Sequence, residues 1–212
     1  MQQLFIWGEG FRGYKKVKGV PRMMNSFVRN TLTDCERTWT LYIPNNECVK
    51  PQGIYKLPNE LFLEISENQS ILFDFIGLEY NVKIVSEDLL HFLESKGLTE
   101  GYEIAKIINV VDKSGKILKA KNYYALRFYV FDDDFLVYSE EGAVYGKGAK
   151  GRKLYPNMTI KSSEKKQIFV LENPLYSYSF IVTQEIRNDI VKKKFIGPYF
   201  YTTQEYIKAY NG

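Results

Sequence analysis

The sequence predicts an α+β fold with a mainly antiparallel sheet and two or three helices. Short segments rich in Tyr and Phe, residues that favour strands, are separated by recurring Gly, Pro and Asn turn signals. Helical spacing of apolar residues is clear in two stretches, and each follows a Ser or Thr that suits an N-cap. A strand–cap–helix unit also occurs twice, 97 residues apart. The chain's 212 residues suffice for one large domain or two small ones.

The N-terminal third is irregular in pattern and strand-rich. Thr38–Ile43 and Leu61–Ile65 are its strand candidates, and turn signals surround them. We therefore predict an irregular N-terminal region over residues 1–70 and an α+β region over residues 71–212. One compact domain over the whole chain is the alternative.

The first strand–cap–helix unit begins with two strands, at Ile71–Ile76 and Tyr80–Val85. Ser86 then suits an N-cap, and Gly97 suits the end of the helix. Between them an apolar stripe at helical spacing predicts one buried helix face. The stripe consists of Leu89, Phe92 and Leu93.

Strands at about Tyr102–Asp112 and Tyr123–Phe131 lead toward the second unit. That unit has strands at Gln167–Leu171 and Tyr176–Val182, with Thr183 as the N-cap of a helix. The residues expected to point inward from this helix are Ile186, Ile190 and Val191, and a closing strand is expected at Tyr199–Thr202.

The two units align without a gap. Residues 71–102 and 168–199 share six identities in 32 positions. A duplication explains this similarity, but strand–cap–helix is also a common arrangement that arises independently. Ancestry therefore stays open, while the secondary structure that the units imply does not depend on it.

The sequence shows no targeting segment, so the cytoplasm is the default expectation. The net charge of +4 is too small to indicate nucleic-acid binding by itself. The N-terminus lacks the basic region of a signal peptide, and no apolar stretch is long enough for a membrane span. Cys35 and Cys48 fit free thiols in a reducing compartment, with one disulfide as the alternative.

No strong catalytic or cofactor motif is present. His91 is the single histidine, so a multi-histidine metal site is excluded and a His-based triad would depend on this residue alone. A position on the polar helix face or a packing role is the simpler expectation for it. The segment Gly146–Lys153 is glycine-rich and basic but lacks the GxxxxGK[ST] order of a phosphate loop. We expect no catalysis, no cofactor and no metal.

An acidic segment is followed at once by a basic one between residues 132 and 166. The consecutive carboxylates Asp132, Asp133 and Asp134 fit a turn or a solvent-facing edge better than a hydrolytic pair, whose members come from separate elements. The two segments form either solvated loops or adjacent patches that steer a charged partner. On the second interpretation the partner-binding residues are Asp132, Asp133, Asp134, Tyr138, Glu140, Glu141, Tyr145, Lys147, Lys150, Arg152 and Lys153.

The second half resembles a known protein family. Tyr123–Phe128, Ile168–Leu171 and Ile181–Ile186, followed by Ile196-Gly197 and Phe200, are similar to the pattern of bacterial immunity proteins of polymorphic-toxin systems, in particular the families numbered 43 and 11. The resemblance covers residues 80–202, and no match is seen for residues 1–70. Pro198 departs from the pattern, which has an apolar residue after the glycine.

The resemblance implies an immunity protein that binds and neutralises a cognate bacterial toxin by occlusion, without chemistry of its own. No membrane partner is expected. The alternative from the residues alone is a nucleic-acid-binding accessory protein that uses the basic 147–166 segment, although the neighbouring carboxylates would repel phosphates. An unfamiliar enzyme built on carboxylates is a further alternative.

Overall fold

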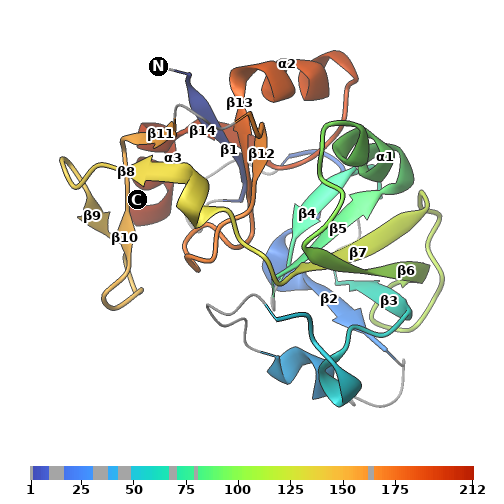
Figure 1. Cartoon of the computed structure of the whole chain (residues 1–212). Coiled ribbons are helices and arrows are strands. Elements are labelled where there is room, and N and C mark those ends of the chain that lie inside the picture. Colours follow the sequence, from blue (N-terminus) through green and yellow to red (C-terminus); the bar gives the residue numbers. More distant parts are fainter. Residues whose placement is uncertain are drawn as a thin grey trace.

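The fold is α+β, as the sequence predicts. A computed structural model describes residues 2–9, 17–30, 38–42, 49–66, 71–78, 81–161 and 165–212. Within these residues the strands form a six-stranded sheet, a four-stranded sheet and two short ribbons, accompanied by three α-helices (Figure 1). Cys35 and Cys48 lie outside the described residues.

The six-stranded sheet has the strand order β2-β3-β6-β7-β5-β4. Four of its neighbouring pairs are antiparallel, and only β3 and β6 run parallel. The alternation predicted at Leu61, Leu63 and Ile65 is confirmed, because these side chains are buried and those between them are not. The strands are β2 (Ser26–Arg29), β3 (Glu60–Ile65), β4 (Phe75–Gly77), β5 (Val82–Ser86), β6 (Tyr102–Val111) and β7 (Tyr123–Phe128).

The four-stranded sheet joins the beginning of the chain to its end. Its order is β12-β13-β1-β14, and all of its pairs are antiparallel. Figure 1 shows the blue strand β1 among orange and red strands. The strands are β1 (Leu4–Gly8), β12 (Ile168–Phe169), β13 (Phe180–Thr183) and β14 (Tyr199–Thr202).

Each of the three helices follows a strand and begins at a hydroxyl cap. The helices are α1 (Glu87–Ser95), α2 (Gln184–Lys192) and α3 (Thr203–Asn211). The predicted caps are confirmed, since Ser86 Oγ accepts from Leu89 N and Thr183 Oγ1 accepts from Ile186 N. The two predicted strand–cap–helix units are thus present, one in each sheet, and the same arrangement occurs a third time where Thr202 joins β14 to α3.

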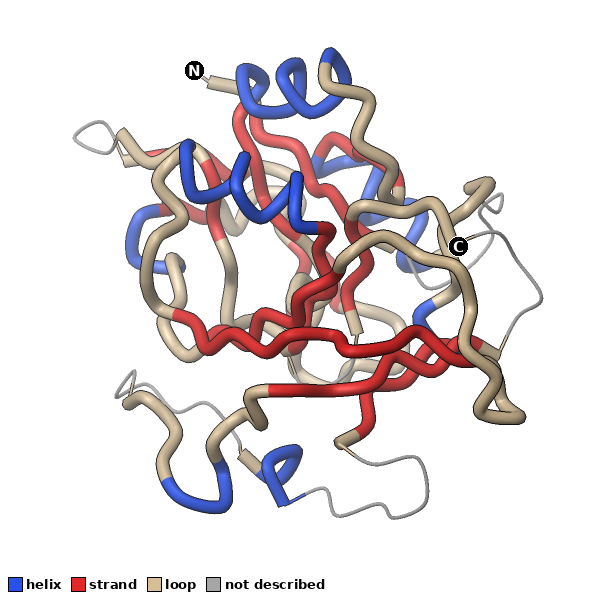
Figure 2. Tube along the Cα trace, turned by 90° about the vertical axis from the view of Figure 1, so that its right-hand side faces the viewer, coloured by secondary structure: helices blue, strands red, loops and turns tan. Residues whose placement is uncertain are grey.

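Helices α1 and α2 share one core with both sheets. Lys96 Nζ lies 2.7 Å from Asp189 Oδ2, and the rings of Phe92 and Phe195 lie 5.5 Å apart between centroids. Figure 2 shows helices on one side of the long strands of the six-stranded sheet and short helical turns on the other. Helices α1 and α2 thus cover the junction between the sheets.

A buried ion pair fastens the N-terminal segments to the six-stranded sheet. Arg127 in β7 is only 1% exposed, and its guanidinium donates to Glu103 Oε2 at 2.6 and 2.8 Å. The same guanidinium donates to the carbonyl oxygens of Trp39 and Tyr55, in the 3-10 helices η2 (Thr38–Leu41) and η3 (Gly53–Tyr55). Several acceptors for one buried guanidinium offset the cost of removing its charge from water.

A buried lysine connects the two sheets. Lys83 in β5 is fully buried, and its Nζ donates to Ser177 O at 2.7 Å, in the turn before β13. Its ammonium also lies 5.0 Å from the ring centroid of Phe128 and 5.5 Å from that of Phe180. Burial lowers the pKa of Lys83 to about 7.

Several predicted elements were wrong. Thr38–Leu41 forms a 3-10 helix instead of part of a strand, and the Trp39 carbonyl that a strand would use in a ladder accepts from Arg127. The strand expected from Tyr176 begins only at Phe180, after a turn closed by Ser177 and Ser179. Val191 is 56% exposed rather than inward, because Ile186 and Ile190 alone form the buried stripe.

Candidate functional site

A long excursion separates β7, the last strand of the six-stranded sheet in the chain, from β12 of the four-stranded sheet, and we call residues 132–161 the arm. It contains the 3-10 helix η4 (Asp133–Phe135) and two antiparallel ribbons. Figure 1 shows β9 and β10 at the left of the view, away from the six-stranded sheet. The ribbons pair β8 (Leu136–Tyr138) with β11 (Met158–Ile160), and β9 (Val144–Tyr145) with β10 (Lys153–Leu154).

Asp132 anchors the base of the arm to the framework. The exposed position expected for it is wrong, because its side chain is buried: its Oδ2 accepts from Val170 N at 2.8 Å and its Oδ1 from Lys166 Nζ at 2.6 Å. Burial raises the pKa of Asp132, and Lys166 opposes that change. Asp132 thus ties the arm to residues on both sides of β12.

The other two acidic residues of the run differ from each other. Asp133 accepts from Glu172 N at 2.8 Å and from the Tyr138 hydroxyl at 3.1 Å. Burial raises the pKa of the half-buried Tyr138, so this hydroxyl keeps its proton and remains a donor. Asp134 is exposed. Of the three consecutive carboxylates, only that of Asp134 is exposed rather than buried or half-buried.

The acidic and basic residues of the arm meet across a ribbon rather than forming two separate patches. Glu140 Oε2 lies 2.6 Å from Lys153 Nζ, which also lies 5.7 Å from the ring centroid of Tyr145. The hydrogen bond from Lys153 to Glu140 raises the pKa of the lysine. Glu140 is therefore paired within the arm. The next residue, Glu141, is also exposed but is not part of this ion pair.

The tip of the arm is a basic turn tied to the end of α3. Lys147 N donates to Asn211 Oδ1 at 2.8 Å, and Asn211 Nδ2 donates to Tyr145 O at 3.3 Å. The tip joins two strands, so it lacks the strand–helix setting of a phosphate loop. Its exposed cations are Lys147, Lys150 and Arg152.

Apolar side chains are exposed among these charges. The largest exposure is that of Tyr145, at 66%. Aromatic residues and Arg are enriched at protein-binding surfaces, and both types are exposed here. The exposed apolar side chains of the arm are Phe135, Val137, Val144 and Tyr145.

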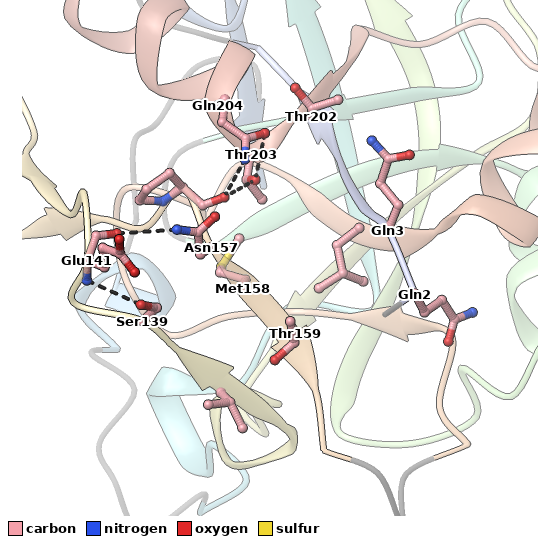
Figure 3. A pocket seen from close by; sticks show the side chains of 13 residues that line it. Gln2, Gln3, Ser139, Glu141, Asn157, Met158, Thr159, Thr202, Thr203 and Gln204 are labelled. Atoms are coloured by element: carbon pink, nitrogen blue, oxygen red, sulfur yellow. Dashed lines mark hydrogen bonds between the residues drawn. The ribbon is translucent and has the colours of Figure 1, made fainter.

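A groove of about 460 Å³ lies at the foot of the arm. One wall comes from the β8/β11 ribbon, and the others come from the start of β1 and the junction of β14 with α3 (Figure 3). Thr203 Oγ1 and Gln204 Nε2 both donate to Pro156 O, which holds α3 against the arm. The lining consists of Gln2, Gln3, Leu4, Val137, Ser139, Glu141, Pro156, Asn157, Met158, Thr159, Thr202, Thr203 and Gln204.

Only Glu141 of the predicted site residues lines this groove. Sequence reasoning missed the rest because β1, the arm and α3 are distant in the chain. One signal for α3 was available: Thr202 and Glu205 form a capping box, in which Glu205 N donates to Thr202 Oγ1 and Thr202 N donates to Glu205 Oε2.

Among the residues that the structure describes, no strong catalytic constellation emerges from the geometry. Across the described ranges, no three His, Cys, Asp or Glu side chains are placed to hold a metal ion. His91 is exposed on α1, so of the two expected roles the position on the polar face holds and a packing role does not. None of the helices in the described part of the chain is long and apolar enough to cross a membrane.

The glycine of the resembling pattern has a structural explanation. A Cβ on Gly197 would lie 2.4 Å from Trp7 Cζ2, so no other residue fits without moving the indole. The indole Nε1 donates to Pro198 O at 3.3 Å, and the Trp7 ring stacks on Phe200 at 5.2 Å. Ile168 and Phe169, also in the pattern, are buried in β12. The pattern therefore describes how the four-stranded sheet is packed.

Comparison with known proteins agrees with this interpretation. No curated protein matches the chain. The family model of immunity protein 43 matches residues 13–212, so the similarity extends through most of the N-terminal third, where no match had been seen. Because the match spans nearly the whole chain, the protein belongs to the immunity protein 43 family.

Proposed function

We propose that the protein neutralises a cognate protein toxin by binding to it and occluding its functional surface, with no catalysis of its own. The observation that carries the proposal is the arm of this immunity-family chain, which presents charged and aromatic side chains on an internally fastened scaffold. We place the partner in the cytoplasm.

The fastening of the arm favours tight binding. Its base is held by Asp132 and its tip by Asn211, so little conformational freedom is lost when a partner docks. Tyr and Arg frequently dominate binding energy, and Tyr145 and Arg152 are exposed here. The exposed cations at the tip also steer an acidic surface of the toxin during encounter.

Neutralisation by the arm is tested with three charge reversals at its tip, Lys147→Glu, Lys150→Glu and Arg152→Glu together. The matched control reverses three exposed lysines between β6 and β7, Lys113, Lys116 and Lys119. Each variant is co-expressed with the cognate toxin, and the affinity is measured by surface plasmon resonance. We expect the arm variant to bind at least about tenfold more weakly, with most of the loss in the association rate at low salt.

Equal effects of the two triple variants would reject the arm as the contact surface. Occlusion also requires stoichiometric action, so toxin activity should fall in proportion to added protein and vanish near one equivalent. Inhibition by substoichiometric amounts would instead indicate catalysis by this chain.

Nucleic-acid binding remains the competing interpretation of the basic segment. The pairing of Lys153 with Glu140 and the neighbouring Glu141 reduce the positive charge available to phosphates. We expect no mobility shift of single-stranded DNA or RNA at about 50 mM salt, where phosphate contacts are strongest. A shift that weakens steeply as salt rises would favour the nucleic-acid function.

A further inference from the structure

The groove at the foot of the arm has an uneven distribution of charge. Glu141 is the one ionisable side chain among the described lining residues. Within the described chain its carboxylate takes part in no ion pair or hydrogen bond, whereas the neighbouring Glu140 is paired with Lys153. In Figure 3, Glu141 and Gln2 lie at opposite ends of the labelled residues.

The backbone of Glu141 is held in place although its carboxylate is not. Glu141 N donates to Ser139 Oγ at 3.2 Å, and Asn157 Nδ2 donates to Glu141 O at 3.3 Å. Two neighbouring polar residues of the lining thus fix the position from which the carboxylate extends. A carboxylate presented in this way is ready to pair with a cation from outside the chain.

The rest of the lining is suited to a polypeptide. Amide side chains both donate and accept hydrogen bonds, as a peptide backbone does, and the groove holds them from three segments of the chain. Asn157 and Gln204 each use one amide hydrogen within the chain, which leaves the second hydrogen for a ligand. Leu4, Val137 and Met158 add apolar surface. The amide side chains are those of Gln2, Gln3, Asn157 and Gln204.

Other ligand classes fit this lining less well. The described lining contains no Lys or Arg to bind a phosphate, and Glu141 would repel one. It contains no aromatic ring on which a sugar or a base could stack. Polar residues also outnumber apolar ones in the lining, whereas small-molecule pockets are lined predominantly by apolar side chains, although the volume lies within their range of about 300–1,000 Å³.

We propose that the groove receives an extended segment of the toxin polypeptide, with a Lys or Arg side chain of that segment directed at the Glu141 carboxylate. This inference rests on the proposed function, since it assumes a toxin partner, and adds a recognition element at the foot of the arm. The tip would then steer the encounter, while the groove would select the partner by the position of one cation.

The first test compares Glu141→Gln with Glu140→Gln for binding to the purified toxin. The two substitutions remove the same charge from adjacent exposed residues, but only Glu141 lines the groove. We expect Glu141→Gln to weaken binding by about 10- to 30-fold, chiefly through faster dissociation, because it removes a charge-assisted contact. Glu140→Gln should change affinity by less than about threefold, as expected for a rim charge.

The second test fills the groove without altering charge. Val137→Trp places a large ring against the groove wall, and Val191→Trp is its control on α2, because both valines are at least half exposed. We expect the first variant to weaken toxin binding at least tenfold (about 1.4 kcal/mol) and the second to leave it unchanged. Thermal unfolding of both variants confirms that the fold is kept.

The outcomes separate this inference from the proposed function. If wild-type protein binds the toxin and both groove variants bind equally well, the groove is not the recognition site, while the proposed function stands. If the wild type does not bind the toxin, both are overturned. Rescue of Glu141→Lys by an acidic substitution at a single Lys or Arg of the toxin would identify the partner side chain.

Discussion

Arg127 in the six-stranded sheet and Arg152 at the arm tip carry the same guanidinium in opposite surroundings. Arg127 is buried, paired with Glu103 and hydrogen-bonded to two backbone carbonyls. Arg152 is exposed. The framework formed by the two sheets uses polar groups to fasten distant segments, whereas the arm, beyond its anchors Asp132 and Asp133, presents polar groups to solvent. Charge therefore serves folding in one region and is available for binding in the other.

The same contrast exists between carboxylates. Asp74 is buried in the framework, where it accepts from Ser86 Oγ, Lys121 Nζ and Ile196 N. Glu141 on the arm is exposed, with a carboxylate that contacts no cation of the described chain. Framework charges should accordingly affect the free energy of unfolding, and arm charges should affect the affinity for the toxin.

The largest difference between framework and arm is expected when the same change, Arg to Met, is made separately in each region, as Arg127→Met and Arg152→Met. Arg127→Met leaves the buried Glu103 carboxylate without its ion pair, so we expect the free energy of unfolding to fall by about 3–5 kcal/mol. Arg152→Met should change it by no more than about 0.5 kcal/mol, as for most surface substitutions. Urea denaturation followed by circular dichroism measures both values. Similar losses in the two variants would remove the distinction between the regions.

A second test uses the pH dependence of Lys83→Met. The pKa of Lys83 is about 7 in the folded protein and near its ordinary value when unfolded. Between these values the unfolded chain binds more protons, so the wild type gains stability as pH rises, by about 1.4 kcal/mol per pH unit at most. Below pH 7 both states hold the proton and this dependence ends.

The methionine variant lacks this titration. We therefore expect its stability relative to the wild type to be greatest near pH 7 and to decline as the pH is raised toward 10. Denaturation of both proteins at several pH values gives the difference, and contributions from other titrating groups cancel. A difference that does not change with pH would show that Lys83 stays protonated in the fold.

The parts of the fold that local sequence determines were predictable. Ser86 and Thr183 cap their helices through contacts three residues away, and the strand Tyr199–Thr202 was placed correctly. Elements fixed by distant partners were not predictable. Trp39 lies in a 3-10 helix instead of a strand, and its carbonyl accepts a hydrogen bond from Arg127, 88 residues later. The buried Asp132 carboxylate accepts one from Val170 N, 38 residues later.

The candidate site shows the same limit. The charged segment was recognised from composition. Composition does not show that Asp132 and Asp133 accept hydrogen bonds within the chain whereas Asp134 is exposed. The groove requires β1 and α3 to meet the arm, and no local pattern encodes that meeting. Sequence thus identified the arm as a region, and the structure separated its anchors from its exposed residues.

A smaller effect is expected where the two regions meet. Asp132→Asn keeps an acceptor for Val170 N but turns a neutral amide toward Lys166, so we expect a loss of about 1–3 kcal/mol in unfolding free energy. Asp134→Asn, two residues away and exposed, should lie within about 0.5 kcal/mol of the wild type. Chemical denaturation distinguishes them, and equal stabilities would argue against Asp132 as the anchor.

The smallest effect is expected for the exposed pair of Glu140 and Lys153. Its atoms lie 2.6 Å apart, yet both side chains contact solvent, so salt should screen their attraction. A double-mutant cycle with Glu140→Gln and Lys153→Met should give a weak coupling at low ionic strength and none measurable at about 1 M salt. A strong, salt-independent coupling would mean that the ribbon depends on this pair as the framework depends on Arg127 and Glu103. The arm would then be a second structural core rather than a surface for binding.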